Sequence, residues 1–326
     1  MKIKSTFLPL NSNLLSFKLN IKIVLLLCSS VLYSLSSQGQ YNSKAPVMYL
    51  RYTSALSLQL GGTNFLGDLG GNSGSGKPFI KDLNLKATRL FAGLSYSYFI
   101  DNGLSINGDF HYTTVAGADS LITEKTGHAA GRYNRNLSFK SSIYEFQTTV
   151  KIYPIQMLND EKLMRVLPYI GLGFGFFHFN PRAELNGSWY DLQPLHLEGQ
   201  DFAEYPERHN YKLTQPYIPL MVGVSYRLSN SYLISLDAIF RTTFTDYIDD
   251  ASTTYVDPSL FDKYLSAADA SIAKQLYYRG RNSSALTTNS YRGYSGNDSY
   301  TSAFLTLTYL FNKGSLPSYH DKPPVE

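Results

Sequence analysis

From about residue 55 onward, apolar and polar residues alternate with a period of two in eight separate segments of the chain. In the segment 143–153, IYEFQTTVKIY, aromatic and aliphatic residues alternate with glutamate, glutamine, threonine and lysine. Such alternation predicts a β-strand with one apolar and one polar face. Each segment is close to the roughly 9–11 residues that a tilted strand needs to cross a bilayer. The segments are 55–63, 88–100, 104–115, 143–153, 166–179, 216–228, 232–244 and 301–311.

The connections between these segments alternate in length. Those at 101–103, 154–165 and 229–231 are short or intermediate, whereas the other four are long. Outer-membrane barrels connect their strands in this way, with tight periplasmic turns and longer outer loops. We therefore predict an all-β fold over residues 41–311: an eight-stranded antiparallel up-and-down transmembrane β-barrel with long outer loops and short periplasmic turns.

The composition agrees with a membrane-embedded sheet. Charged residues make up only 17% of the chain, and aromatic residues 14%, including 27 tyrosines. After residue 40 no apolar stretch is long enough to span a bilayer as a helix. A closed sheet is the other structure that satisfies every backbone polar group in lipid.

The first forty residues have the pattern of a secretory signal peptide. Lysines precede the apolar run 23–35, which is followed by the small and polar residues SSQGQ. Cys28, the single cysteine, lies in this segment, so the exported chain would have neither disulfides nor thiolate sites. The lysines of the signal account for the whole net charge of +4, which leaves no basic surface for nucleic acid. They are Lys2, Lys4, Lys18 and Lys22. We expect the protein in the bacterial outer membrane, in contact with its lipids.

The strand faces predict a polar network inside the barrel. A lysine or arginine facing lipid at the bilayer midplane costs about 2–4 kcal/mol, so the charged faces of the strands should point inward. An eight-stranded barrel has room inside for side chains and little else, which argues against a conducting pore. The residues predicted for this network are Asp109, His111, Glu145, Lys151, Arg227, Asp237 and Arg241.

Two stretches have superficial matches to known sites. GNSGSGKP at 71–78 fails as a phosphate-binding loop because Pro78 stands where a serine or threonine is needed. FTDYIDDASTTYVD at 244–257 is rich in carboxylates but lacks the spacing of an EF-hand. A solvated loop is the main interpretation of the second stretch, and a divalent ion bridging neighbouring lipopolysaccharide is the alternative. No serine–histidine–acid pattern is recognisable, so we expect no catalytic residue, no cofactor and no resident metal.

Several motifs resemble those of PorG-like outer-membrane β-barrels of the Bacteroidetes, which are associated with type IX protein secretion. They occur in order along most of residues 55–311 and include GGTNFLGDLGGN, DLNLKATR, PYIGLGFGFFHFNP, WYDLQPL and FTDYIDDASTTY. The resemblance implies a non-enzymatic barrel that anchors or organises secretion machinery through components of its periplasmic ring. These motifs also suggest which loop positions make contacts with other molecules. They are Asp68, Trp189, Tyr190, Asp191, Asp246 and Asp250.

The tail at 312–326 departs from barrels that stop at a terminal aromatic residue, because a polar, proline-containing segment continues here. We expect it in the periplasm, either without fixed structure or as a docking peptide. Two other functions stay open: a structural envelope barrel with ligand-binding outer loops, and a lipid-modifying enzyme.

Overall fold

The computed structural model describes residues 50–69, 85–122, 127–158, 164–281, 290–294 and 296–311. The predicted signal peptide at 1–40, the glycine-rich stretch at 71–78 and the tail at 312–326 lie outside the described residues. The strands are β1 (Thr53–Leu66), β2 (Arg89–Asp101), β3 (Leu104–Ala118), β4 (Ser138–Ile152), β5 (Val166–Leu185), β6 (Ser188–Asp191), β7 (Thr214–Arg227), β8 (Tyr232–Thr243) and β9 (Ser299–Phe311). The helices are α2 (Gly127–Arg135), α3 (Pro154–Met157), α4 (Leu260–Tyr264) and α5 (Ala267–Tyr277), with 3-10 turns η2 (Leu85–Ala87), η3 (Asp119–Leu121) and η4 (Gln193–Leu195).

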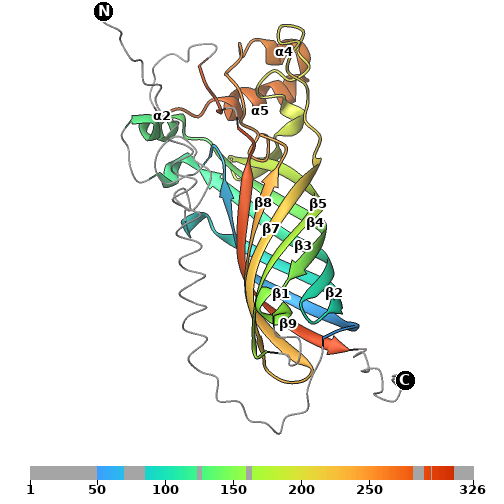
Figure 1. Cartoon of the computed structure of the whole chain (residues 1–326). Coiled ribbons are helices and arrows are strands. Elements are labelled where there is room, and N and C mark those ends of the chain that lie inside the picture. The colour runs from blue at the N-terminus through green and yellow to red at the C-terminus, as the bar shows by residue number, and fades with distance from the viewer. Residues whose placement is uncertain are drawn as a thin grey trace, which may run out of the picture. The chain divides into compact units, whose positions relative to one another are not determined.

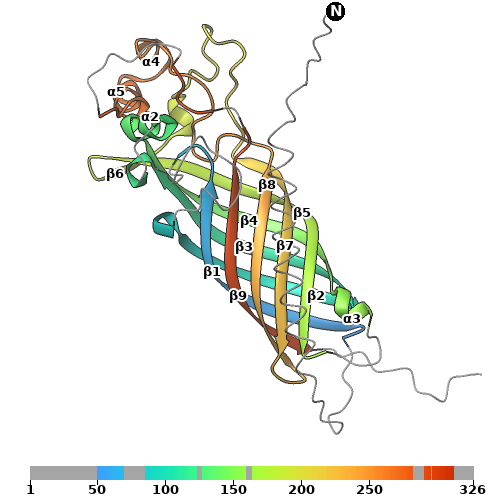
Figure 2. The same cartoon turned by 60° about the vertical axis from the view of Figure 1, so that its left-hand side comes forward.

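Eight of these strands, all except β6, close into an antiparallel barrel (Figure 1). Each strand pairs with the one before it in the chain, β7 pairs with β5, and β1 pairs with β9 to complete the ring. The prediction of an eight-stranded up-and-down barrel is confirmed. The strand β6 pairs only with the far end of β5 and forms a hairpin that projects beyond the barrel (Figure 2).

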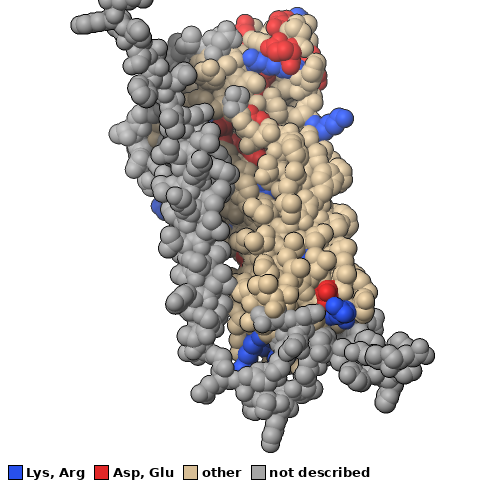
Figure 3. All heavy atoms as spheres, in the orientation of Figure 1, with Lys and Arg blue, Asp and Glu red and all other residues tan. Residues whose placement is uncertain are grey.

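The outer wall of the barrel is apolar. Large hydrophobic side chains that the alternation placed on one face are exposed, with Leu58 at 62%, Leu236 at 65% and Leu305 at 56%. In Figure 3 the visible middle of the wall is almost free of charged side chains. A closed barrel with such a wall satisfies its backbone internally and faces hydrocarbon, so the protein resides in the bacterial outer membrane. No helix in the described ranges is both long and apolar enough to cross a membrane.

The two ends of the barrel differ in their connections (Figures 1 and 2). At one end, which we call the turn end, β2–β3 and β7–β8 are joined by short turns and α3 follows β4. The other end, the loop end, holds α2, α4, α5 and β6. This asymmetry is the one that the spacing of the segments predicted.

The long connections at the loop end fold into a cap with its own hydrophobic core. We use the term loop cap for residues 67–69, 186–213, 244–281, 290–294 and 296–298. Its core includes the buried side chains of Ile248 and Leu276. Aromatic rings pack within it: Phe202 stacks on Tyr264 with centroids 4.3 Å apart, and Phe261 meets Tyr277 edge-on at 5.4 Å. Sequence periodicity did not predict this cap.

Glycines in the wall make room for aromatic rings in the lumen. A Cβ atom added at Gly175 on β5 would lie 2.7 Å from the ring of Tyr217, which is fully buried. A Cβ atom at Gly223 on β7 would lie 2.6 Å from the ring of Tyr169. These rings fill the lumen close to the backbone, and only glycine leaves the space.

We expect Gly175→Val to destabilise the folded barrel by about 1–3 kcal/mol, because the added atoms overpack the lumen against Tyr217. Urea unfolding of the barrel in lipid vesicles measures the change. Gly108→Val on β3 is the matched control, since a Cβ atom there has no neighbour within 4 Å. Equal stabilities of the two variants would contradict this account of the lumen.

Candidate functional site

The centre of the lumen holds a buried ion-pair network around Glu145. Arg241 Nε donates to Glu145 Oε2 at 2.9 Å, and His111 Nδ1 lies 3.1 Å from the same oxygen. Arg241 Nη1 donates to Ser302 Oγ at 2.9 Å. Its guanidinium also lies 4.8 Å from the ring centroid of Tyr300. These charged side chains are inaccessible to solvent, so the network joins opposite walls and fills the lumen.

A second polar group lies nearer the turn end. Asp237 accepts hydrogen bonds from Tyr169 Oη at 2.8 Å and Thr306 Oγ1 at 2.5 Å. Asp109 accepts from Gln147 Nε2 at 2.9 Å. The ammonium of Lys151 lies 4.9 Å from the ring centroid of Tyr169. The structure therefore places charged side chains inside the barrel at two levels, each held by hydrogen bonds.

Arg227 is the one member of the predicted network that lies elsewhere. It is half-buried and ends β7, and its backbone N–H donates to the carbonyl of Arg165 at 2.8 Å. The alternation placed it on the inward face, but it lies at the end of its strand, beyond both polar groups.

The loop cap contains four neighbouring carboxylates, which we call the cap carboxylates: Asp68, Asp246, Asp249 and Asp298. Asp249 and Asp298 are fully buried, and burial together with the neighbouring carboxylates raises the pKa of both well above the ordinary value. Burial raises the pKa of Asp68 to about 6 and that of Asp246 to about 7. Four like charges in one buried region oppose their common ionisation.

Backbone amides hold these carboxylates in place. Asp249 accepts from the N–H groups of Leu69 and Ala251, each at 3.1 Å, and Asp298 accepts from that of Ile248 at 2.9 Å. The second oxygen of Asp298 has no hydrogen-bond partner among the described residues. Because Asp68 follows β1 and Asp298 precedes β9, the cluster ties the cap to the ends of two strands that are distant in sequence and paired in the barrel.

Arginines pair with other carboxylates of the same region. Arg135 binds Asp119 through two hydrogen bonds of 2.8 and 2.9 Å. Arg292 binds Glu198 at 3.2 Å and Asp250 at 3.1 Å. The stretch 244–257 is therefore part of the cap interior, and its interpretation as a solvated loop is wrong, because tertiary contacts with distant loops bury it.

The predicted loop contacts fall into two sets. Asp68 and Asp250 are buried, at 7% and 0% exposure, so neither reaches the surface. Asp246 is half-buried and accepts from Ser252 Oγ at 2.8 Å. The residues at 189–191 lie on the projecting hairpin, where Trp189 is 45% exposed, Tyr190 packs partly buried against the cap core and Asp191 pairs with Arg182.

The described residues offer little to catalysis or metal binding. No three His, Cys, Asp or Glu side chains in these ranges are arranged to hold a single metal ion. Side-chain hydrogen bonds of histidine join His111 to Glu145 and His178 to Thr214, and neither pair includes a serine. The first pair is also sealed inside the barrel.

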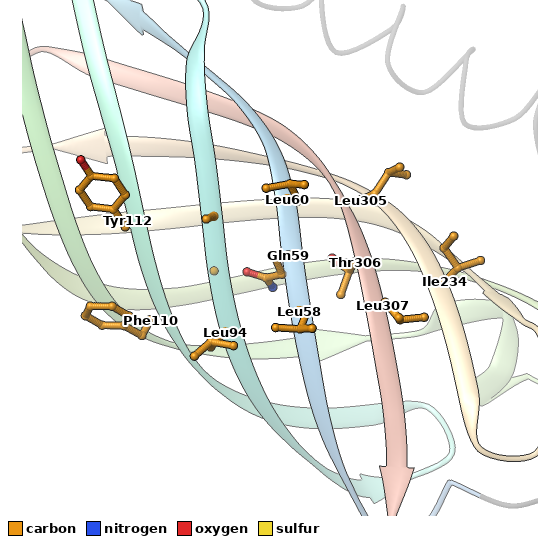
Figure 4. Close-up of a pocket in the computed structure, with 12 residues that line it drawn as sticks. Leu58, Gln59, Leu60, Leu94, Phe110, Tyr112, Ile234, Leu305, Thr306 and Leu307 are labelled. Carbon is orange, nitrogen blue, oxygen red and sulfur yellow. The ribbon is translucent and has the colours of Figure 1, made fainter.

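A hollow of about 590 Å³ lies in the wall across β1, β2, β3, β8 and β9 (Figure 4). Leucines line it together with the small residues Ala92 and Gly93. Gln59 and Thr306 are its only polar side chains besides the hydroxyl of Tyr112. The hollow opens to the lipid and contains no group suited to acid–base chemistry.

Comparisons with known proteins concern the family and the fold. The sequence model of a family described as a domain of unknown function (DUF6089) matches residues 49–259. No curated protein matches the chain. Among solved structures, the attachment invasion locus protein Ail of Yersinia pestis is similar, with 9% identity, coverage of 80% of this chain and 99% of that chain, and a TM-score of 0.36.

Two further solved structures give similar values. Neisserial surface protein A (NspA) is 10% identical to this chain over an alignment that covers 79% of this chain and 97% of NspA, with a TM-score of 0.37. The outer-membrane protein OprG of Pseudomonas aeruginosa is 11% identical to this chain over an alignment that covers 80% of this chain and 97% of OprG, with a TM-score of 0.33.

Proposed function

We propose a function for this chain, which belongs to the family described as a domain of unknown function (DUF6089): it is a non-enzymatic outer-membrane scaffold. In this proposal it acts as a type IX secretion component that anchors or organises machinery on the periplasmic side. The predicted export signal at 1–40 brings the chain to the envelope, and the proposal assigns the tail at 312–326 to the periplasm.

The filled lumen is the observation that carries the scaffold proposal. Arg241, Tyr217 and Tyr300 are fully buried inside the barrel, and the loop cap folds at one end. A barrel filled in this way serves neither as a channel nor as a transport path. We infer that the protein functions through contacts of its exposed surfaces with other molecules. The motifs that resemble those of PorG-like barrels support a role of these contacts in secretion.

The turn end offers a surface for a periplasmic partner. The segment at α3 exposes Met157 at 58% and Leu158 at 85%, and Leu228 in the β7–β8 turn is 52% exposed. The neighbouring Met157 and Leu158 would supply the apolar part of such a contact. At the same end, Arg51 and Asp101 form an ion pair with two hydrogen bonds between the guanidinium and the carboxylate.

Deletion of the gene, followed by comparison of the secreted and periplasmic proteomes, tests the proposal. We expect secretion cargo to accumulate in the periplasm and to return to the medium when the wild-type gene is restored. A photo-reactive residue at Leu158 should then crosslink to a component of the secretion ring, whereas the same residue at Lys274 in the loop cap should not. Normal secretion with a weakened envelope would overturn the secretion role.

A structural barrel with ligand-binding outer loops is the second candidate. The observation that favours it is the loop cap, whose hydrophobic core and paired charges give it a fixed outer surface. In that case deletion leaves secretion unchanged and alters envelope integrity alone.

A further inference from the structure

A basic pair lies on the outward wall toward the loop end. Lys140 on β4 is directly opposite Arg182 on β5 in the strand register. Four residues nearer the turn end, Tyr144 is opposite His178, and two residues further Phe146 is opposite Phe176, where the apolar wall begins. At about 3.4 Å per residue, the basic pair lies roughly 14 Å along the tilted strands from Tyr144, beyond the apolar part of the wall and on the side of the lipid headgroups.

Two like charges in a directly opposed pair destabilise a sheet unless another group compensates. Arg182 is compensated in part, because Asp191 of the projecting hairpin forms an ion pair with it. The ammonium of Lys140 lies 5.7 Å from the ring centroid of Trp189. The salt bridges of the described residues do not include Lys140, so a positive charge stays available on this part of the wall.

The hollow lies in the same lipid-facing wall, nearer the turn end than this pair and centred on the strands beyond β3. Tyr112, at one end of the hollow, is the register partner of Tyr144, and Lys140 is the partner of Ala116, four residues further along β3. An acyl chain that extends from a headgroup at Lys140 toward the turn end therefore reaches the level of Tyr112 after roughly 14 Å. The lining also includes Phe110 and Leu60 (Figure 4). Ala92 lies between β1 and β3 on this face, because it is the register partner of both Tyr112 and Leu60. Ala92 supplies a methyl group where the neighbouring outward positions carry larger side chains, so the wall is recessed. A flexible hydrocarbon chain matches an apolar recess of this kind.

We propose that this face of the barrel is a binding site for a phosphorylated, acylated lipid of the outer leaflet, of the lipid A type. Lys140 and Arg182 bind the phosphate through charge-assisted hydrogen bonds, and Trp189 packs beside the headgroup. One acyl chain of the same lipid lies in the hollow over Ala92. The site is independent of the secretion role, because it lies on the lipid-facing wall and not on the turn end.

The single tryptophan of the chain, Trp189, makes the site directly observable. The barrel is reconstituted in phosphatidylcholine vesicles with increasing fractions of lipid A, and the fluorescence of Trp189 is recorded. Native mass spectrometry counts the bound lipid, because changes at Lys140 also alter the surroundings of Trp189. We expect saturable binding to the wild-type protein and to Lys140→Arg, and about tenfold weaker binding to Lys140→Gln. Lys274→Gln, an exposed change on α5, is the matched control and should bind as the wild type does.

Two further comparisons separate the phosphate and the acyl contributions. Dephosphorylated lipid A should bind about as weakly to the wild type as lipid A binds to Lys140→Gln. Ala92→Phe, which fills the hollow without changing any charge, should also weaken binding. Equal binding of lipid A to the wild type and Lys140→Gln would overturn the proposal. Three other results would also overturn it. They are binding of dephosphorylated lipid A to the wild type as tightly as lipid A, binding of lipid A to Ala92→Phe as tightly as to the wild type, and a Trp189 fluorescence change with inorganic phosphate equal to that with lipid A.

Discussion

Replacement of Arg241 by methionine is expected to destabilise the barrel by about 3–5 kcal/mol, the usual effect of removing one partner of a buried ion pair. Arg241 and Glu145 are both fully buried, with 2.9 Å between Nε and Oε2. Methionine fills much of the space of arginine but offers no donor. Glu145 would then keep only His111 and the more distant Tyr217 hydroxyl, at 3.4 Å, as partners for its charge.

Urea unfolding of the barrel in vesicles measures this effect, and two variants show its origin. The double variant Glu145→Gln with Arg241→Met should recover most of the lost stability, because no unpaired charge stays buried. Arg51→Met removes an arginine from the exposed pair with Asp101 and should change stability by less than about 1 kcal/mol. If Arg241→Met unfolds at the same urea concentration as Arg51→Met, the ion pair does not stabilise the lumen.

The barrel could be predicted from the sequence because its signal is local and repeated. Residues such as Leu58 and Leu236 alternate with polar neighbours, and the energetic penalty for a charge in lipid fixes which face points outward. The same rule placed Glu145 and Arg241 inside. It did not show that they pair with each other, because 96 positions separate them and alternation carries no information about which strands face across the lumen.

The loop cap could not be predicted in the same way. Asp249 and Asp298 come together from opposite ends of the long β8–β9 connection, 49 positions apart, and no periodic pattern connects them. Carboxylates in a long connection ordinarily indicate a solvated segment, whereas here Ile248 and Tyr255 beside them are buried in the cap core. Sequence reasoning therefore identified the composition of the stretch 244–257 but missed its burial, which depends on contacts with Leu69 and Glu198.

The loop cap should lose stability as pH rises from about 4 to about 7. Carboxyl groups whose pKa is higher in the folded state than in the unfolded chain bind protons preferentially in the folded state. Their stabilising contribution is complete below their ordinary pKa and is lost as pH rises through the folded-state pKa. For Asp68, whose pKa rises from 3.8 to about 6, linkage gives an upper contribution of about 3 kcal/mol. Asp246, with a pKa of about 7, extends the pH range to neutrality.

Hydrogen exchange of the amides at 245–256, expressed as protection factors with the intrinsic rates divided out, measures this loss between pH 4 and pH 8. Asp298→Asn should reduce the pH dependence and increase protection toward the alkaline end of the range, because it removes a group that becomes a buried negative charge as pH rises. Its amide oxygen retains the acceptor for the Ile248 N–H, and its NH₂ group supplies donors where Asp298 has an unpartnered oxygen. Asp262→Asn is the matched control, since Asp262 is exposed and pairs with Lys274. Protection that stays constant from pH 4 to pH 8, or equal slopes for Asp298→Asn and the wild type, would show that the cap carboxylates do not exchange protons within this range.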